Sequence, residues 1–266
     1  MAILNPKTRG AIQGRLAAAM FLSAAVGIVF ADESRNPVFA GRAEAEFHRA
    51  QARLQSVTND PAAAWQFARA CYDFEDFATN DTGRATLAIQ GIAACRQLLA
   101  QQPKSAPGHY YLGMNLGQLA RTEILGALKI VKQMDVEFRT ADNLDAHFDY
   151  AGPARCLGLL YRDAPGWPTS IGSRHKAREW LERAVQLAPD SPENHLNLVE
   201  SWLQWNDRTG AKNELKTLDA VWPSAQKNLT GQAWEQSWND WSTRRDAARK
   251  KLDESAVPSK PPKNSR

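Results

Sequence analysis

The chain has 266 residues, of which 43% are apolar, enough for one large domain or a short helical array with its own core. It carries 33 basic and 29 acidic residues. Three of the basic residues lie within the first 31 positions, so the remainder has 30 against 29, a net charge of +1, and its composition gives no support for nucleic-acid binding.

The first 31 residues predict a signal peptide. Its apolar run, Leu16 to Ala31, follows three basic residues, Lys7, Arg9 and Arg15. A small-residue cleavage site ends at Ala31, so we expect the cut after Ala31 and a periplasmic or secreted protein. A retained signal anchor is the alternative, although the run is shorter than the ~20 residues of a spanning helix. No other segment is apolar enough to span a bilayer, so no integral membrane domain is expected.

Helical periodicity dominates the rest of the chain. Residues 32–60 predict a polar lead with one amphipathic stretch, Ala43 to Leu54, and Asp60-Pro61 fits an N-cap followed by proline at the first helical position. No run alternates apolar and polar β-branched residues, so no sheet is expected. Residues 254–266 predict a disordered basic tail. The approximate helices are Pro61–Ala78, Gly83–Gln101, His109–Arg121, Glu123–Leu144, Pro153–Arg162, Arg174–Leu187, Pro192–Trp205, Thr209–Val221 and Gly231–Asp253.

A recurring pattern in every second helix decides the fold class. In AREWLERAVQLAP, the residues Ala177, Leu181, Ala184 and Pro189 stand at offsets 0, 4, 7 and 12, as in the second helix of a tetratricopeptide repeat. The offsets recur at Gly91, Cys95, Leu98 and Pro103, at Met134, Phe138, Ala141 and Ala146, and at Ala211, Leu215, Leu218 and Pro223. Matching first-helix patterns are Leu112-Gly113-Leu116, Leu157-Gly158-Tyr161 and Leu198-Val199-Trp202. We therefore predict an all-α, tetratricopeptide-like array of antiparallel helix pairs over residues 61–253.

The predicted array is irregular. Gly113 and Gly158 are 45 residues apart, whereas tetratricopeptide repeats recur about every 34 residues. We attribute the excess to an inserted helix and to the loop Ala164–Ser173, which holds two Pro and two Gly. The stretch Leu125–Val136 is interpreted as a buried inserted helix. A membrane-surface helix is the alternative, for which its two lysines are few.

From about His109 to Leu218, the order of motifs resembles the T-component family associated with tripartite ATP-independent periplasmic (TRAP) transporters. The eukaryotic regulators of microtubule dynamics are similar more distantly. The segments that carry the resemblance are HYYLGMNLGQLAR, ILGALKIVKQ, FDYAGPARCLGLLYRDAPGWPTSIGS and KAREWLERAVQLAPD. The resemblance implies a periplasmic protein that partners an extracytoplasmic solute-binding protein and holds a small apolar ligand. The chain departs from the family in lacking a lipid-attachment cysteine after the predicted cut.

The expected binding residues lie on first helices and on the inserted loop. They are Tyr110, Met114, Arg155, Tyr161, Arg162 and Trp167. Arg155 and Arg162 are seven residues apart on one helix face and could bind a carboxylate, and ion pairs to Asp149 and Asp163 are the alternative. Trp167 is expected to fold back over the first-helix face and form one wall of a binding groove.

Two further features have two interpretations each. Cys71 and Cys95 flank a predicted turn and could form a disulfide in an oxidising compartment, or could be buried core residues. Trp234, Trp238 and Trp241 form a stripe that predicts a capping helix, with a partner-docking face as the alternative.

No catalytic, phosphate-binding or metal motif is present, so no metal and no cofactor are expected. The five histidines form no paired ligand motif, and His109 and His195 are interpreted as packing residues. We expect a non-enzymatic exported binding scaffold with a protein partner. The alternatives are an all-helical enzyme, for which dispersed carboxylates such as Glu75 and Asp76 are the only candidates, or a purely structural envelope protein.

Overall fold

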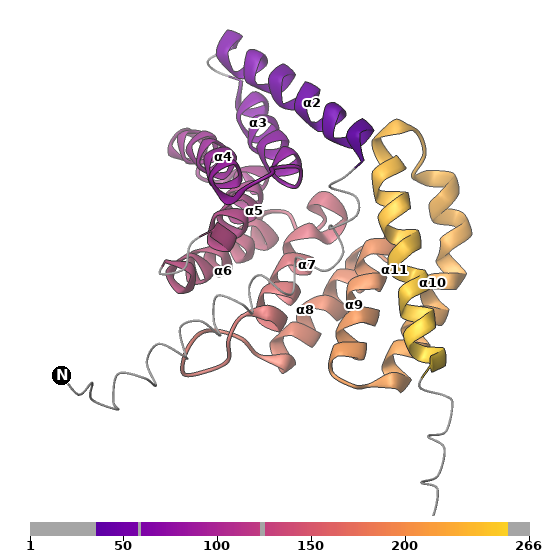
Figure 1. Ribbon diagram of the computed structural model, residues 1–266. Coiled ribbons are helices and arrows are strands. Elements are labelled where there is room, and N and C mark those ends of the chain that lie inside the picture. The colour runs from indigo at the N-terminus through magenta and orange to yellow at the C-terminus, as the bar shows by residue number, and fades with distance from the viewer. Residues whose placement is uncertain (1–35, 58–59, 123–125, 255–266) are drawn as a thin grey trace, which may run out of the picture. The chain divides into compact units, whose positions relative to one another are not determined.

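The computed structural model describes residues 36–57, 60–122 and 126–254, so the predicted signal peptide and basic tail lie outside the described residues. The described residues form helices joined by loops and turns, without a strand (Figure 1). The helices are α2 (Pro37–Ser56), α3 (Pro61–Glu75), α4 (Asp81–Gln101), α5 (Ala106–Thr122), α6 (Ala127–Leu144), α7 (Phe148–Asp163), α8 (Arg174–Leu187), α9 (Pro192–Gln204), α10 (Arg208–Asn228), the short 3₁₀ helix η3 (Gln232–Trp234) and α11 (Glu235–Glu254).

The chain divides into two compact units, with the boundary in the sequence between Leu187 and Ala188. Helices α2 to α8 belong to the first unit, and α9 to α11 belong to the second. The predicted repeat domain, residues 61–253, spans both. Within each unit, consecutive helices pair as α3 with α4, α5 with α6, α7 with α8, and α9 with α10. The predicted all-α helical repeat is therefore confirmed.

The helical fold begins before the predicted start at Pro61. Helix α2 covers most of the segment expected to be a polar lead, and its Phe47 ring lies 5.5 Å from the rings of Phe67 and Phe74 on α3. This apolar contact gives α2 a buried stripe, which is what a surface helix needs for stability. The N-cap at Asp60 is as predicted, because its carboxylate accepts a hydrogen bond from the Ala62 amide at 2.9 Å.

Helix α10 runs through Pro223 and ends at Asn228, so the predicted end at Val221 is wrong. A proline inside a helix removes one backbone hydrogen bond. Here Trp222 and Ala225, on either side of it, are both buried. Their packing offsets the missing hydrogen bond and keeps the last turns helical.

Close approach at two glycines fixes the register of the helix pairs. A Cβ atom on Gly113 of α5 would lie 2.5 Å from the Phe138 ring of α6, and one on Gly158 of α7 would lie 2.5 Å from Leu181 of α8. Phe138 and Leu181 both stand at offset 4 of the second-helix pattern. In two successive pairs, the glycine at the same first-helix position therefore contacts the residue at offset 4 of the second helix, as the shared register predicted.

Helix α6 is the regular partner of α5 rather than an additional helix. Val131 and Phe138 face the core, whereas Lys129 and Lys132 are exposed. The expected burial of this stretch holds for Ala127 and Val131 but not for Val136, which is 58% exposed. The inserted helix of the prediction is the second helix of an ordinary pair. None of the helices in the described ranges has the length and apolar character needed to cross a bilayer.

The tryptophan stripe packs inside the second unit. The Trp238 indole donates a hydrogen bond to the Leu229 carbonyl oxygen at 2.6 Å, and its ring lies 5.2 Å from Trp222 and 5.0 Å from Trp241. Trp234, in η3, lies 5.9 Å from Trp241. These contacts support the capping interpretation, because a repeat unit needs its terminal apolar face covered.

His109 and His195 make the same two contacts in different units. Nδ1 of His109 lies 2.6 Å from Glu137, and Nε2 lies 3.0 Å from the Pro103 carbonyl oxygen. His195 contacts Glu214 and the Pro189 carbonyl oxygen in the same way. Burial lowers the pKa of His195, but the hydrogen bonds to Glu214 and Pro189 outweigh it and the pKa is raised. Each histidine thus connects the second helix of its pair with the turn before the first helix, in agreement with the packing interpretation.

Candidate functional site

Helix α7 begins with a left-handed turn that is unusual for its residues. Asp149, Tyr150 and Ala151 have φ angles of 51°, 54° and 61°. For residues with a Cβ atom, this conformation costs roughly 1–2 kcal/mol each. Arg155, one turn further on, donates from Nη1 to the carbonyl oxygens of Asp149 (3.3 Å) and Tyr150 (3.4 Å). The buried guanidinium therefore holds the strained turn in place.

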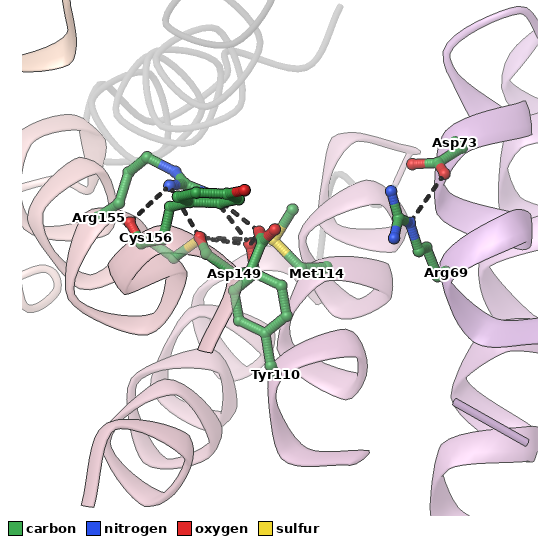
Figure 2. A network of polar contacts seen from close by, with 8 residues as sticks. Arg69, Asp73, Tyr110, Met114, Asp149, Arg155 and Cys156 are labelled. Atoms are coloured by element: carbon green, nitrogen blue, oxygen red, sulfur yellow. Dashed lines mark hydrogen bonds and ion pairs between the residues drawn. The ribbon is translucent and has the colours of Figure 1, made fainter. Parts of the chain in front are cut away.

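The Asp149 side chain is fixed by two helices. Its Oδ2 accepts a hydrogen bond from the Tyr110 hydroxyl of α5 at 2.7 Å and from Arg155 Nη2 at 3.0 Å (Figure 2). The Arg155 side chain is 8% exposed, whereas the Asp149 side chain is 35% exposed. A Cβ atom on Gly152 would lie 2.7 Å from the Tyr110 oxygen, so this glycine permits the approach. The Asp149 carboxylate is thus held by Tyr110 and by the buried Arg155, and it remains partly exposed to a ligand.

Aromatic rings and sulfur atoms support the network. The Tyr110 ring lies 5.3 Å from Phe148, and Tyr111 stacks on Trp65 at 5.8 Å. Cys156 Sγ lies 3.4 Å from Met114 Sδ and 4.0 Å from the Tyr110 oxygen. Burial, and then the Asp149 charge, raise the pKa of Tyr110 well above its usual value, so its hydroxyl stays a donor.

A second charged pair comes from α3. Arg69 Nε lies 3.4 Å from Asp73 Oδ2, and the two side chains are 56% and 48% exposed. Figure 2 shows this pair on α3, apart from the Asp149 network, with Arg69 in contact with Asp73. Desolvation raises the pKa of Asp73 to about 6. The Arg69 charge opposes this shift, and the Asp149 charge adds to it. We call this surface of α3, α5 and α7 the binding face; its charged residues are Arg69, Asp73, Asp149 and Arg155.

Three of the predicted binding residues meet at this face, namely Tyr110, Met114 and Arg155. Arg162 does not join them, because its Nε and Nη2 contact the two carboxylate oxygens of Asp163 at 2.7 and 2.9 Å. With Arg155 paired to Asp149, the ion-pair alternative is what the structure contains, and the shared carboxylate site at Arg155 and Arg162 is wrong. Both arginines already have acidic partners in their own helix.

Tyr161 also lies apart from the binding face. Its ring is buried, its hydroxyl donates to Asp135 of α6, and Arg139 of α6 donates to the same hydroxyl oxygen. Tyr161 is six residues from Arg155, so the two side chains leave α7 on different sides. Tyr161 therefore joins α7 to α6.

The prediction that Trp167 forms a wall of a groove is wrong, because the residue is 89% exposed. The loop closes on itself instead of lying back over the helices. The Gly172 amide donates to the Pro165 carbonyl oxygen at 2.9 Å, and the amides of Thr169 and Ser170 donate to the Gly166 carbonyl oxygen. These bonds turn the chain within a few residues and leave the indole in solvent.

The cysteines are not bonded in the structure. Cys71 and Cys95 are buried free thiols, and burial raises the pKa of both. The disulfide expectation is therefore not met, and the two residues fill the core as the alternative proposed. Cys95 occupies offset 4 of its helix pattern, the position at which Leu181 packs in a later pair.

Neither carboxylate considered for an enzyme offers an accessible catalytic pair. Glu75 is fully buried, and Asp76 accepts a hydrogen bond from Gln118 at 3.2 Å. Within the described ranges, no group of three or more His, Cys, Asp and Glu side chains could hold a metal ion.

Sequence reasoning missed Arg69 and Asp73, and it considered Asp149 only as an ion-pair partner of Arg155. Arg69 and Asp73 are four residues apart, a spacing that places both on one face of a helix and could have indicated them. The left-handed turn at Asp149 was not predicted, because the sequence places Pro153 at the first residue of this helix.

A solved structure supports the repeat architecture. A thermophilic TPR protein of Thermus thermophilus matches with a TM-score of 0.58 and 20% sequence identity, over 79% of this chain and 91% of that chain. The fold is a tetratricopeptide-like helical repeat. No family model and no curated protein sequence matches the chain. In this TPR-like fold, the binding face lies on first helices, and the resemblance to the T-component family stays a prediction.

Replacing Tyr110 with phenylalanine is expected to lower the free energy of unfolding by about 1–2 kcal/mol, because Asp149 loses a buried donor while the ring keeps its packing. Chemical denaturation of both proteins measures the difference. A double-mutant cycle with Asp149→Asn should show that the two changes are not additive, since both residues belong to one hydrogen bond. Additive effects would mean that the 2.7 Å contact contributes nothing.

Proposed function

We propose that the protein is a non-enzymatic, exported scaffold that binds a partner protein at the binding face of α3, α5 and α7. The supporting observation is the set of half-exposed charges that two first helices carry, Arg69 and Asp73 on α3 and Asp149 on α7. Charged groups at this exposure remain available for charge-assisted hydrogen bonds to a ligand. The TPR-like fold is consistent with a role in protein interaction.

Strain at the binding face points in the same direction. Sparsely populated backbone conformations persist where surrounding structure enforces them, and they cluster at ligand-binding sites. Here Arg155 enforces three left-handed residues, and the effect is to aim the Asp149 carboxylate at the surface. A turn with a purely connecting role would not need a buried arginine to hold it.

The finer proposal is that the partner is a periplasmic solute-binding protein and that a small apolar ligand binds nearby. Its support is the resemblance of residues 109–218 to the T-component family, together with the signal-like start of the chain. The charges of the binding face suit a partner surface that carries both acidic and basic groups, because Arg69 lies beside two carboxylates.

The test is capture from periplasmic extract on the immobilised protein, with Asp73→Asn/Asp149→Asn as the site variant. Wild type should retain a solute-binding protein, and the site variant should retain it at least about tenfold less, because hot-spot charges carry much of an interface's energy. Asp246→Asn/Asp253→Asn, two exposed positions of α11, is the matched control and should bind as wild type.

The pH dependence provides a second readout. The pKa of Asp73 is about 6, so its carboxylate gains a proton as the pH falls below that value. Capture by wild type should weaken between pH 7 and 5, and the Asp73→Asn single variant should lose part of this dependence. Equal capture by the site variant and the control would overturn the proposed binding face.

A further inference from the structure

The loop after α7 is a closed, hydrogen-bonded frame. Gly166 and Gly172 pair as a parallel bridge, and the Ser173 amide donates to the Tyr161 carbonyl oxygen at 2.9 Å. Together with the bonds at Pro165 and Gly166, these contacts tie both ends of the loop to each other and to α7. The tip is therefore held in a defined place relative to the start of α8.

This frame presents one large apolar side chain to water. Trp167 is 89% exposed, and its neighbours Gly166, Pro168 and Thr169 are exposed as well. A tryptophan side chain can bury 150–250 Å² when it is covered, so leaving it in solvent is unfavourable. The other exposed large apolar residues of the described chain lie outside this loop and α8; they are Val38, Val57, Ile89, Val136, Leu144 and Tyr150.

Positive charge lies directly beside the loop. The first turn of α8 holds the exposed residues Arg174, His175 and Lys176, and it contains no acidic residue. The start of a helix adds a partial positive charge of its own. The first acidic residues of α8, Glu179 and Glu182, come later and pair with His175 at 3.2 Å and with Arg178 at 2.8 Å. The tip of the loop and the start of α8 thus combine one indole with a positively charged surface.

We propose that this surface docks on a lipid bilayer that carries anionic headgroups, with Trp167 at the interface and Arg174 and Lys176 against the phosphates. Tryptophan is favoured at membrane–water interfaces because its ring is amphipathic, and each nearby cation strengthens binding to an anionic surface. A protein interface would need a contiguous apolar patch with a packed core around the anchor. Trp167 has no such surroundings, which favours the bilayer.

Vesicle sedimentation tests the proposal on the purified protein. Vesicles of phosphatidylcholine with phosphatidylglycerol should bind it, and vesicles of phosphatidylcholine alone should bind it much less. Trp167→Ala should weaken binding about tenfold, as expected for loss of a partly inserted aromatic ring. Arg174→Gln/Lys176→Gln should weaken it about twenty-five-fold, since each cation near the surface contributes about fivefold. Circular dichroism should stay unchanged, because all three side chains are exposed.

Matched variants separate this site from general effects. Lys129→Gln/Lys132→Gln removes the same charge from exposed positions of α6 and should leave binding unchanged. Asp73→Asn/Asp149→Asn should also bind vesicles as wild type, so failure here is distinct from failure of the proposed function. The proposal would be overturned if Trp167→Ala bound vesicles as well as wild type does, or if the α6 variant lost as much vesicle binding as the α8 variant. It would also be overturned if the protein did not bind the mixed vesicles. If the protein does not bind vesicles and Trp167→Ala no longer captures a protein that wild type captures, the loop binds a protein partner instead.

Discussion

Gly158→Ala should destabilise the protein by about 2–3 kcal/mol, although the same change in an open helix position stabilises by about 1 kcal/mol. The added Cβ would lie 2.5 Å from Leu181 Cγ and 3.0 Å from the Leu181 backbone nitrogen. The side chain can rotate, but the backbone nitrogen cannot move without α8 moving away from α7. The overlap must therefore separate a tightly packed helix pair whose core includes Ala177 and Ala184.

Gly41→Ala on α2 is the matched control, because no atom lies within 4 Å of the Cβ that it would add. It should stabilise the protein by about 0.5–1 kcal/mol. Urea denaturation of both variants measures the two effects. If Gly158→Ala were stabilising as well, the contact between α7 and α8, and with it the register of the repeat, would be wrong.

Glu75→Gln is expected to stabilise the protein increasingly as the pH rises. Glu75 is fully buried, and neither of its carboxylate oxygens has a hydrogen-bond partner within the described residues. Burial, followed by the neighbouring charge of Asp76, raises the pKa of Glu75 to about 10, against the opposing effect of Arg84. The folded chain therefore keeps a proton that the unfolded chain releases above about pH 4.5.

The sign of the effect follows from this difference in protonation. Between the unfolded and the folded pKa, the folded state binds more protons, so its stability falls as the pH rises. The loss is roughly 3 kcal/mol at pH 7 and roughly 6 kcal/mol at pH 9, at about 1.4 kcal/mol for each pH unit above 4.5. Glutamine keeps the shape and does not ionise. Its advantage over wild type should be under about 1 kcal/mol at pH 5 and grow to these values.

Denaturation of wild type and Glu75→Gln at pH 5, 7 and 9 measures this growth, and the pH 5 comparison is the internal control. A stability difference that is the same at all three pH values would show that Glu75 does not keep its proton in the folded chain. It would also show that water or a counter-charge reaches the carboxylate.

The helices were predictable where local signals and repeat offsets agreed. Helix α8 has the predicted bounds, because Ala177, Leu181 and Ala184 all point to one buried stripe. Local signals failed where tertiary packing decides the outcome. Pro223 stays inside α10 because the surrounding residues are buried, and α2 is a full helix because Phe47 finds two rings on α3.

The site was predictable in part, for a similar reason. The repeat register places Tyr110, Met114 and Arg155 on first helices, so their convergence could be expected. The turn at Asp149 depends on Arg155 and on Tyr110, which lies 39 residues earlier in the chain. No local pattern encodes a left-handed backbone that is held by a distant hydroxyl. The exposure of Trp167 likewise depends on hydrogen bonds across its loop, which the composition of that loop does not specify.

The two hydrogen bonds of His195 affect how the helices of the second unit unfold together. The ring connects the turn before α9, at Pro189, with Glu214 of α10. In repeat proteins, cooperativity comes from the coupling between neighbouring elements. Because the pKa of His195 is raised in the folded chain, the coupling is strongest while the ring is charged and weakens as the pH rises through that pKa. A pH below that pKa should therefore couple the unfolding of α9 to that of α10 more strongly than a pH above it.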